Sequence, residues 1–177
     1  MADMKVQRSV VVEAPPEKVY DYISDFQRHT EWNYQPQKIE KVSDGPVGVG
    51  STFHTTEALP RELPWLMKKL SPLFFKLMGS ADHTVAEITA MEPARRLAWK
   101  SWQPIRGGKR AVEVEWEILL EPENGGTRLI QRSHWVGKHS MSDPSMFADE
   151  ADHELEDNLG RLKQILESED NHRGEGK

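Results

Sequence analysis

The chain has 177 residues, of which 37% are hydrophobic and 29% charged, a size and composition that suit one domain with a substantial core. It contains no cysteine, which excludes a disulfide framework, a thiolate nucleophile and a cysteine-bound zinc. The net charge of −6 argues against a general nucleic-acid binder, which needs a basic face. No apolar run reaches the ~18 residues of a membrane span, and the N-terminus lacks the apolar core of a signal peptide, so a cytoplasmic protein is expected.

The chain starts with a predicted strand over Lys5–Glu13 that ends at two prolines. Proline suits the first turn of a helix, because its missing N–H group would have no partner there anyway. Apolar residues then recur at spacings of three and four from Val19 to Phe26, which predicts an amphipathic helix. After a break in this pattern, Trp32 is expected on a second short helix.

Six further strands are predicted, most of them joined by turns that contain glycine or proline. Consecutive strands with short connections indicate an antiparallel meander. The glycine-rich stretch at 45–50 joins two strands and opens no helix, so it is interpreted as a turn and not as a phosphate loop. The predicted strands are Lys38–Ser43, Ser51–Glu57, Asp82–Met91, Arg95–Gln103, Lys109–Leu120 and Thr127–Val136.

The last two strands predict which side chains point into the protein. Between Lys109 and Leu120 apolar residues alternate with glutamates, which is typical of a strand with one buried and one wet face. Opposite charges on neighbouring strands stabilise a wet face, so Arg128 and Arg132 are expected outside, opposite the glutamates. Gln131 and Ser133 would then point inward.

A long helix is predicted at the C-terminal end, with Asp143 as N-cap and Pro144 at its first position. Apolar residues from Phe147 to Leu166 recur at steps of three and four, and the helix is expected to end near Glu167. The charged segment 168–177 has no apolar residue and is expected to be disordered. The residues assigned to the solvent side of this helix are Glu150, Glu154, Glu156 and Asp157.

The segment 59–79 is crowded with large apolar side chains and divided by three prolines. Each such side chain gains ~1.5–3 kcal/mol on burial, so the segment is expected to cover something. The alternatives are packing over the sheet edge or a dimer contact, a lid over a cavity, and docking on a membrane surface through lysines beside aromatic residues. The residues assigned to this lid or interface are Trp65, Met67, Leu70, Phe74, Phe75 and Met78.

Several stretches in this order resemble the START/Bet v 1-like (SRPBCC) superfamily, and within it the polyketide cyclase/dehydrase-like branch. They are the strand that runs into Ala14-Pro15 and a helix, Ile23–Phe26 with Trp32 six residues on, the turn at 45–50, and Gly125–Arg128 before the last strand. The resemblance covers about residues 5–167. It implies a single α+β domain over 1–167 with a helix-grip fold. In that fold a curved antiparallel sheet of about six to seven strands wraps around the long C-terminal helix, and two short helices follow strand 1.

The resemblance also implies an internal, mostly apolar cavity with a few polar groups. His54 and His83 flank the segment 59–79 and are the candidates for acid–base chemistry, the alternative being histidines that face outward. Gln131 and Ser133 either contact a ligand or bond to each other. No metal-ligand spacing such as HxH occurs, and no metal or cofactor is expected. The candidate ligand-binding residues are His54, His83, Trp99, Gln103, Trp116, Gln131, Ser133, Trp135, Leu155 and Leu159.

The leading functional hypothesis is a carrier or sensor that binds a hydrophobic small molecule, such as a lipid, a quinone or a polyketide-like compound. The second is a polyketide aromatase/cyclase that uses a cavity histidine, and whether the protein is an enzyme stays open at this point. The third is a protein-interaction module that uses the segment 59–79 to hold a partner or a second copy of the chain. A homodimer or a peripheral membrane contact through 59–79 is the corresponding partner expectation.

Overall fold

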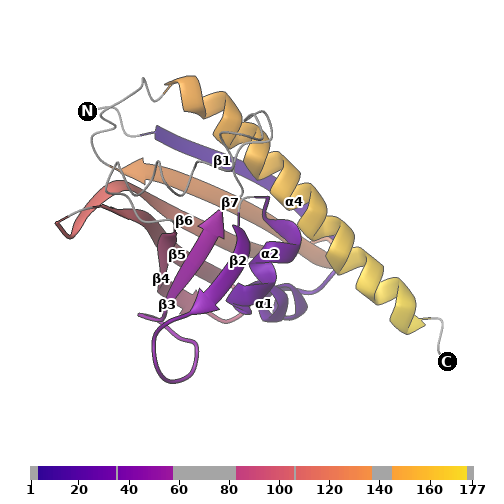
Figure 1. The fold of residues 1–177 in the computed structure, drawn as a ribbon. Coiled ribbons are helices and arrows are strands. Elements are labelled where there is room, and N and C mark those ends of the chain that lie inside the picture. Colours follow the sequence, from indigo (N-terminus) through magenta and orange to yellow (C-terminus); the bar gives the residue numbers. More distant parts are fainter. Residues whose placement is uncertain (1–3, 35, 58–82, 106, 137–144, 175–177) are drawn as a thin grey trace.

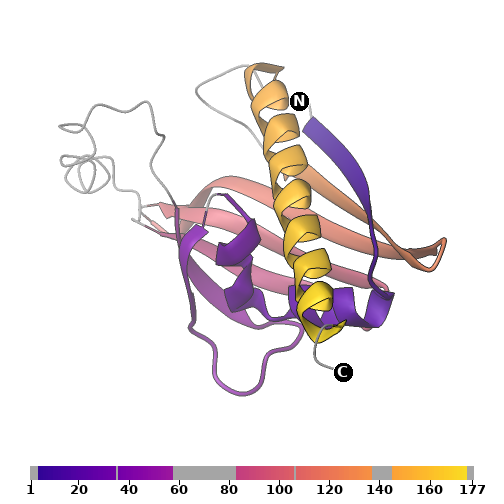
Figure 2. The same ribbon diagram turned by 90° about the vertical axis from the view of Figure 1, so that its right-hand side faces the viewer.

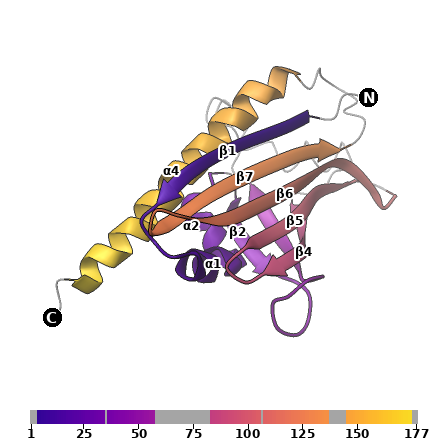
Figure 3. The ribbon, with the colours of Figure 1, turned by 180° about the vertical axis from the view of Figure 1, so that it is seen from behind.

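The computed structural model describes residues 4–34, 36–57, 83–105, 107–136 and 145–174. Their centre is a seven-stranded antiparallel sheet, in which the strands lie side by side in the order β1-β7-β6-β5-β4-β3-β2. Consecutive strands from β2 to β7 are therefore neighbours, and β1 and β2 form the two edges (Figure 3). The strands are β1 (Met4–Val12), β2 (Pro36–Lys41), β3 (Thr52–Glu57), β4 (Thr84–Glu92), β5 (Arg96–Ile105), β6 (Lys109–Glu123) and β7 (Gly126–Val136).

One long helix, α4 (Ser145–Gly174), runs diagonally across the inner face of the curved sheet (Figures 1 and 2). The shorter elements are α1 (Pro16–Ser24), the 3-10 turn η1 (Phe26–Arg28) and α2 (His29–Trp32). The last of these contacts both β2 and α4. The α+β helix-grip fold expected from the sequence is confirmed. None of the helices described here is long and apolar enough to cross a bilayer.

The predicted strands and short helices are all present, and their ends differ from the predictions by a few residues. The largest difference is in α4, which continues to Gly174 instead of ending near Glu167. A polar sequence can extend an existing helix, because each added residue gains a backbone hydrogen bond without a new nucleation cost. The division into one domain and a tail stays a prediction, and the cap at Asp143–Pro144 lies outside the described residues.

The predicted inward and outward faces of β6 and β7 are confirmed. Val114, Ile118 and Leu120 are buried, whereas the intervening glutamates reach the outer face. There Arg132 bonds to Glu117, which is its cross-strand partner. Arg128 pairs with Glu123, further along the strand than the glutamate row that was expected to receive it.

The core lies between the inner face of the sheet and the apolar side of α4. Leu155, Leu159, Leu162 and Leu166 are almost completely buried, in agreement with the predicted apolar stripe. Fully burying each such side chain contributes roughly 1.5–3 kcal/mol. The stripe therefore supplies a large part of the free energy that holds the helix on the sheet.

A few polar contacts fix the position of α4 along the sheet. The buried Asn158 side chain accepts a hydrogen bond from the Tyr34 backbone at 2.9 Å, just after α2. Near the C-terminal end of β1, Lys163 donates to the Val11 carbonyl, and just after the strand Glu167 accepts from the Glu13 amide. Lys163 thus occupies a backbone group of the edge strand β1 that would otherwise be open to pairing with another chain.

Gly126, at the start of β7, lies against the backbone of β1. A Cβ atom at this position would overlap the carbonyl oxygen of Val12, and backbone cannot move aside as a side chain can. We therefore expect Gly126→Ala to lower the free energy of unfolding by about 1–3 kcal/mol, as other overpacked substitutions do. Urea denaturation followed by circular dichroism measures this change.

The matched control is Gly160→Ala, because Gly160 lies within α4 and nothing occupies the space around its missing Cβ. Alanine is favoured over glycine inside a helix by up to about 1 kcal/mol, so this variant should be more stable than the parent protein. If both alanine variants changed stability in the same direction, the close approach of β7 to β1 would not be what requires glycine at position 126.

Candidate functional site

A small cavity of about 50 Å³ lies between the sheet and the helices that cover it. Side chains from η1, α2, the five strands β2–β6 and α4 line it, so it is built by many elements and not by one loop. Its volume is enough for one or two waters, each of which takes about 30 Å³ in the liquid. The lining residues that matter for its chemistry are His29, Thr55, Trp99, Ser101, Trp116 and Glu154.

Two tryptophans form an aromatic wall on the sheet side of the cavity. Trp99 and Trp116 are cross-strand partners on β5 and β6, with ring centroids 6.1 Å apart and planes 11° from parallel. The Trp116 indole donates to the hydroxyl of Ser101 at 2.9 Å. The polar edge of Trp116 is thus bound within the protein while its ring lines the apolar wall.

Buried polar groups lie beside this wall on β7. Gln131 is 0% exposed and Ser133 is 2% exposed, and Ser133 is the cross-strand partner of Trp116. Neither the Gln131 amide nor the Ser133 hydroxyl has a hydrogen-bond partner among the residues that the structure describes. An unsatisfied buried polar group costs about 1–3 kcal/mol, so such groups normally bind ordered water or a ligand.

Among the described lining residues His29 is the one histidine, and the sequence did not single it out. Its Nε2 lies 2.7 Å from the Ile23 carbonyl, to which it must donate, so the neutral ring carries its acceptor lone pair on Nδ1. The ring packs against Phe26, Trp32 and Trp99 at centroid distances of 4.4, 4.8 and 5.2 Å. Burial lowers its pKa from 6.5 to about 4, with the bond to Ile23 acting in the opposite direction. His29 is therefore uncharged at neutral pH.

Glu154 also lines the cavity, which corrects its assignment to the solvent side of the last helix. Its Oε1 atom has no contact with solvent. The physical reason is helical spacing, because Glu154 lies three residues after Ala151 and four before Asn158, both of which are buried. The same spacing was present in the sequence, but a charged residue beside Glu156 and Asp157 was assigned to the wet face with them.

His54 is placed on the outer face of the sheet and His83 directly before β4, and neither is among the described residues that line the cavity, where both were expected. On β3 the neighbours of His54, Phe53 and Thr55, are buried, and side chains alternate between faces along a strand. The two histidine rings stack on each other at 4.1 Å between centroids. The described part of the chain therefore gives them no place in the cavity wall.

The remaining candidates divide into three groups. Leu155 and Leu159 are buried on the face of α4 that meets the sheet. Gln103 and Trp135 are half-buried on β5 and β7, and the Trp135 indole nitrogen is shielded from solvent. The six residues assigned to a lid or interface within 59–79 lie outside the described residues.

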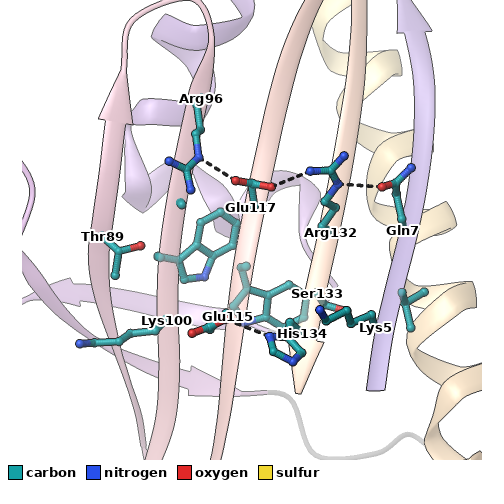
Figure 4. Close-up of a pocket in the computed structure, with 14 residues that line it drawn as sticks. Lys5, Gln7, Thr89, Arg96, Lys100, Glu115, Glu117, Arg132, Ser133 and His134 are labelled. Atoms are coloured by element: carbon teal, nitrogen blue, oxygen red, sulfur yellow. Dashed lines mark hydrogen bonds and ion pairs between the residues drawn. The ribbon is translucent and has the colours of Figure 1, made fainter. Parts of the chain in front are cut away.

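A larger hollow of about 580 Å³ lies on the outer face of the sheet, and Figure 4 shows its lining. A row of side chains crosses four strands there. Arg96 donates to Glu117 at 2.6 Å, Arg132 to Glu117 at 3.1 Å and to Gln7 at 2.7 Å. His134 lies 3.0 Å from Glu115 in the same hollow. These charges largely satisfy one another, and exposed ion pairs contribute only about 0–1 kcal/mol each.

The inner cavity is therefore the candidate site, since its aromatic wall lies next to the buried polar groups of Gln131 and Ser133, which lack described partners. These two residues lie on β7, beside the cavity, and are not among its described lining residues. Within the described ranges no cluster of three or more histidine, cysteine or acidic side chains could hold a metal ion. The described lining offers hydrogen bonding and aromatic contact.

The depressed pKa of His29 predicts how stability depends on pH. The unfolded state takes up a proton near pH 6.5 and the folded state only near pH 4, so stability is fully present above about 6.5 and falls as the pH drops towards 4. Each pH unit that separates the two pKa values is worth about 1.4 kcal/mol, so the free energy of unfolding should fall by roughly 3 kcal/mol. Urea unfolding at several pH values between 7.5 and 4 measures it.

The variant His29→Gln should show a shallower fall over the same range, whatever its stability at pH 7.5, because its side chain does not titrate. His153→Gln serves as control, since His153 is exposed on α4 and should leave the parent's dependence unchanged. Equal slopes for the parent and His29→Gln would show that His29 is not the group responsible.

Comparison with known proteins supplies the remaining evidence. The family model described as "polyketide cyclase / dehydrase and lipid transport" matches residues 3–167. No curated protein sequence matches the chain.

Solved structures with the same fold are similar over most of the chain. Ara h 8.0201 has a TM-score of 0.64 at 13% identity, with 94% of this chain and 99% of that one covered. A protein from Rhizobium leguminosarum has a TM-score of 0.60 at 13% identity, with 94% and 96% covered. DynU16, from the dynemicin biosynthetic locus, has a TM-score of 0.59 at 18% identity, with 92% of this chain but 47% of that one covered. At these identities the likeness shows the fold alone.

Proposed function

The chain belongs to the polyketide cyclase/dehydrase and lipid transport family, and from that membership we propose that it binds a hydrophobic small molecule between α4 and the inner face of the sheet. The membership confirms the resemblance inferred from the sequence. The single observation that carries the proposal is the set of fully buried polar atoms on Gln131 and Ser133 without described partners, beside the tryptophan wall.

The volume of the cavity sets a condition on binding. A drug-sized ligand typically occupies a pocket of about 300–1,000 Å³, several times the roughly 50 Å³ present here. Entry therefore requires side chains or α4 to move away from the sheet. The ligand would take the place of water at Gln131 and Ser133, and its apolar part would contact Trp99 and Trp116.

Lipids, quinones and polyketide-like compounds all combine an extended apolar part with few polar atoms, and they are the classes we propose. A role as carrier or sensor accords with a site that combines an aromatic wall with polar side chains.

Enzymatic cyclisation is a second candidate, and the position of His29 in the cavity wall is the observation that favours it. An efficient general base has a pKa near the working pH. His29, with a pKa of about 4, is a weak base at neutral pH, so binding is the better supported function. The use of 59–79 as an interaction or membrane-docking surface stays a prediction, because that segment lies outside the described residues.

Tryptophan fluorescence tests the proposed site directly. Titration with a short-chain quinone, which quenches indole emission on contact, should give saturable quenching of the parent protein. Trp116→Phe should lose a substantial part of this quenching, because Trp116 lines the cavity.

The matched control is Trp102→Phe. Trp102 lies on the same strand as Trp99 but on the outer face, where the Arg110 guanidinium lies 3.9 Å from its ring centroid. Its removal should leave the ligand-dependent quenching intact. Quenching that never saturates, or that Trp116→Phe and Trp102→Phe diminish equally, would contradict binding in the inner cavity.

A further inference from the structure

We propose that Gln131 and Ser133 select ligands whose polar head is uncharged and both donates and accepts hydrogen bonds, such as an amide or a hydroxyl group. This inference rests on the proposed function, since it assigns the chemical class of the ligand bound in the same interior site. It goes beyond the family membership, which names no head group.

The first argument is the hydrogen-bonding capacity of the two side chains. The Gln131 amide offers two donors on Nε2 and an acceptor on Oε1, and neither atom has a partner among the described residues. The Ser133 hydroxyl, two residues along the same face of β7, offers one donor and two lone pairs. A head group that satisfies both side chains must therefore supply an acceptor and a donor at once.

The second argument is the lack of compensation for a buried charge. No lysine or arginine is among the described side chains that line the cavity, and the histidine there is neutral. The cation in register with Gln131 is Arg8 on the edge strand β1, and it is already paired with Asp152 of α4. A buried carboxylate without a cation would pay a large desolvation penalty, and Glu154 in the same wall would repel it.

A positively charged head group is the principal rival, because Glu154 could attract it. An ammonium group has donors only, however, so it would leave the donors on Gln131 Nε2 and on the Ser133 hydroxyl unsatisfied. It would also lose its hydration on entering the interior. The neutral donor–acceptor head is the one that matches the buried atoms of both Gln131 and Ser133.

The experiment compares four ligands with the same ten-carbon chain at pH 7.5. They are decanol and decanamide, which are neutral, decanoate, which is anionic, and decylamine, which is cationic. Binding is measured by isothermal titration calorimetry. We expect decanol and decanamide to bind at least ten times more tightly than decanoate and decylamine, since one unsatisfied buried partner is worth about a factor of ten.

The variants Gln131→Leu and Ser133→Ala should each reduce this preference by about tenfold, because each removes one partner of the head group. Their matched controls are Gln37→Leu and Ser9→Ala, which make the same changes at exposed strand positions and should leave the preference unchanged. Thermal unfolding verifies that each variant folds, and the two buried sites test the inference independently of each other.

A second measurement uses the ionisation of the fatty acid itself. Lowering the pH from 7.5 to 5.5 increases the protonated fraction of decanoic acid, whose carboxyl resembles that of a free side chain with a pKa near 4.3. The affinity for the acid should rise while the affinity for decanol stays constant. His29 remains neutral at both pH values, so it does not contribute to the change.

The possible outcomes separate the two proposals. If all four ligands bind with equal affinity, or if decylamine binds most tightly, the inference about the head group is overturned and the proposed function stands. If none of the four binds and the quinone gives no saturable quenching, the proposed function itself fails. If the buried-site variants keep the parent's preference, Gln131 and Ser133 are bound to structural water and do not select the ligand.

Discussion

The packing of the apolar side of α4 against the inner face of the sheet is the contact on which the rest of this structure depends. The sheet is buried on one face only, and no other described element is long enough to cover it (Figure 2). Once Leu155, Leu159, Leu162 and Leu166 are buried, the helix can no longer rotate about its axis. In this fixed orientation Glu154 lies at the cavity and Asn158 lies against the backbone beside α2.

Because side chains alternate between faces along each strand, the two faces of the sheet carry different kinds of side chain. On the outer face, arginines and glutamates form ion pairs that remain exposed to water and gain little from each other. On the inner face of the same strands, Trp116, Gln131 and Ser133 lie in a region of low dielectric constant. A hydrogen bond there has a larger effect on free energy than the same bond outside.

Alternation and capping signals in the sequence were sufficient to predict the order of the elements and the inward direction of Gln131 and Ser133. The alternation did not show to which face His54 points, because Ser51–Glu57 has polar residues on both faces of the strand. His29 could not be found, since it lies in a turn of helix too short to show a period and becomes buried only through contacts with Phe26 and Trp99. Both failures concern contacts between elements, which no local pattern encodes.

The polar contacts of α4 are unevenly distributed along its length. From the middle of the helix onwards, Asn158, Lys163 and Glu167 bond to backbone groups of neighbouring segments. Nearer the start of the helix, Asp152 forms an exposed ion pair with Arg8. Breaking the bonds to backbone groups leaves those groups without their partners, whereas water replaces the ion pair of Asp152 with Arg8 at little cost. Among the described polar contacts, those from Asn158 onwards therefore resist separation of the helix from the sheet more than the ion pair at Asp152 does.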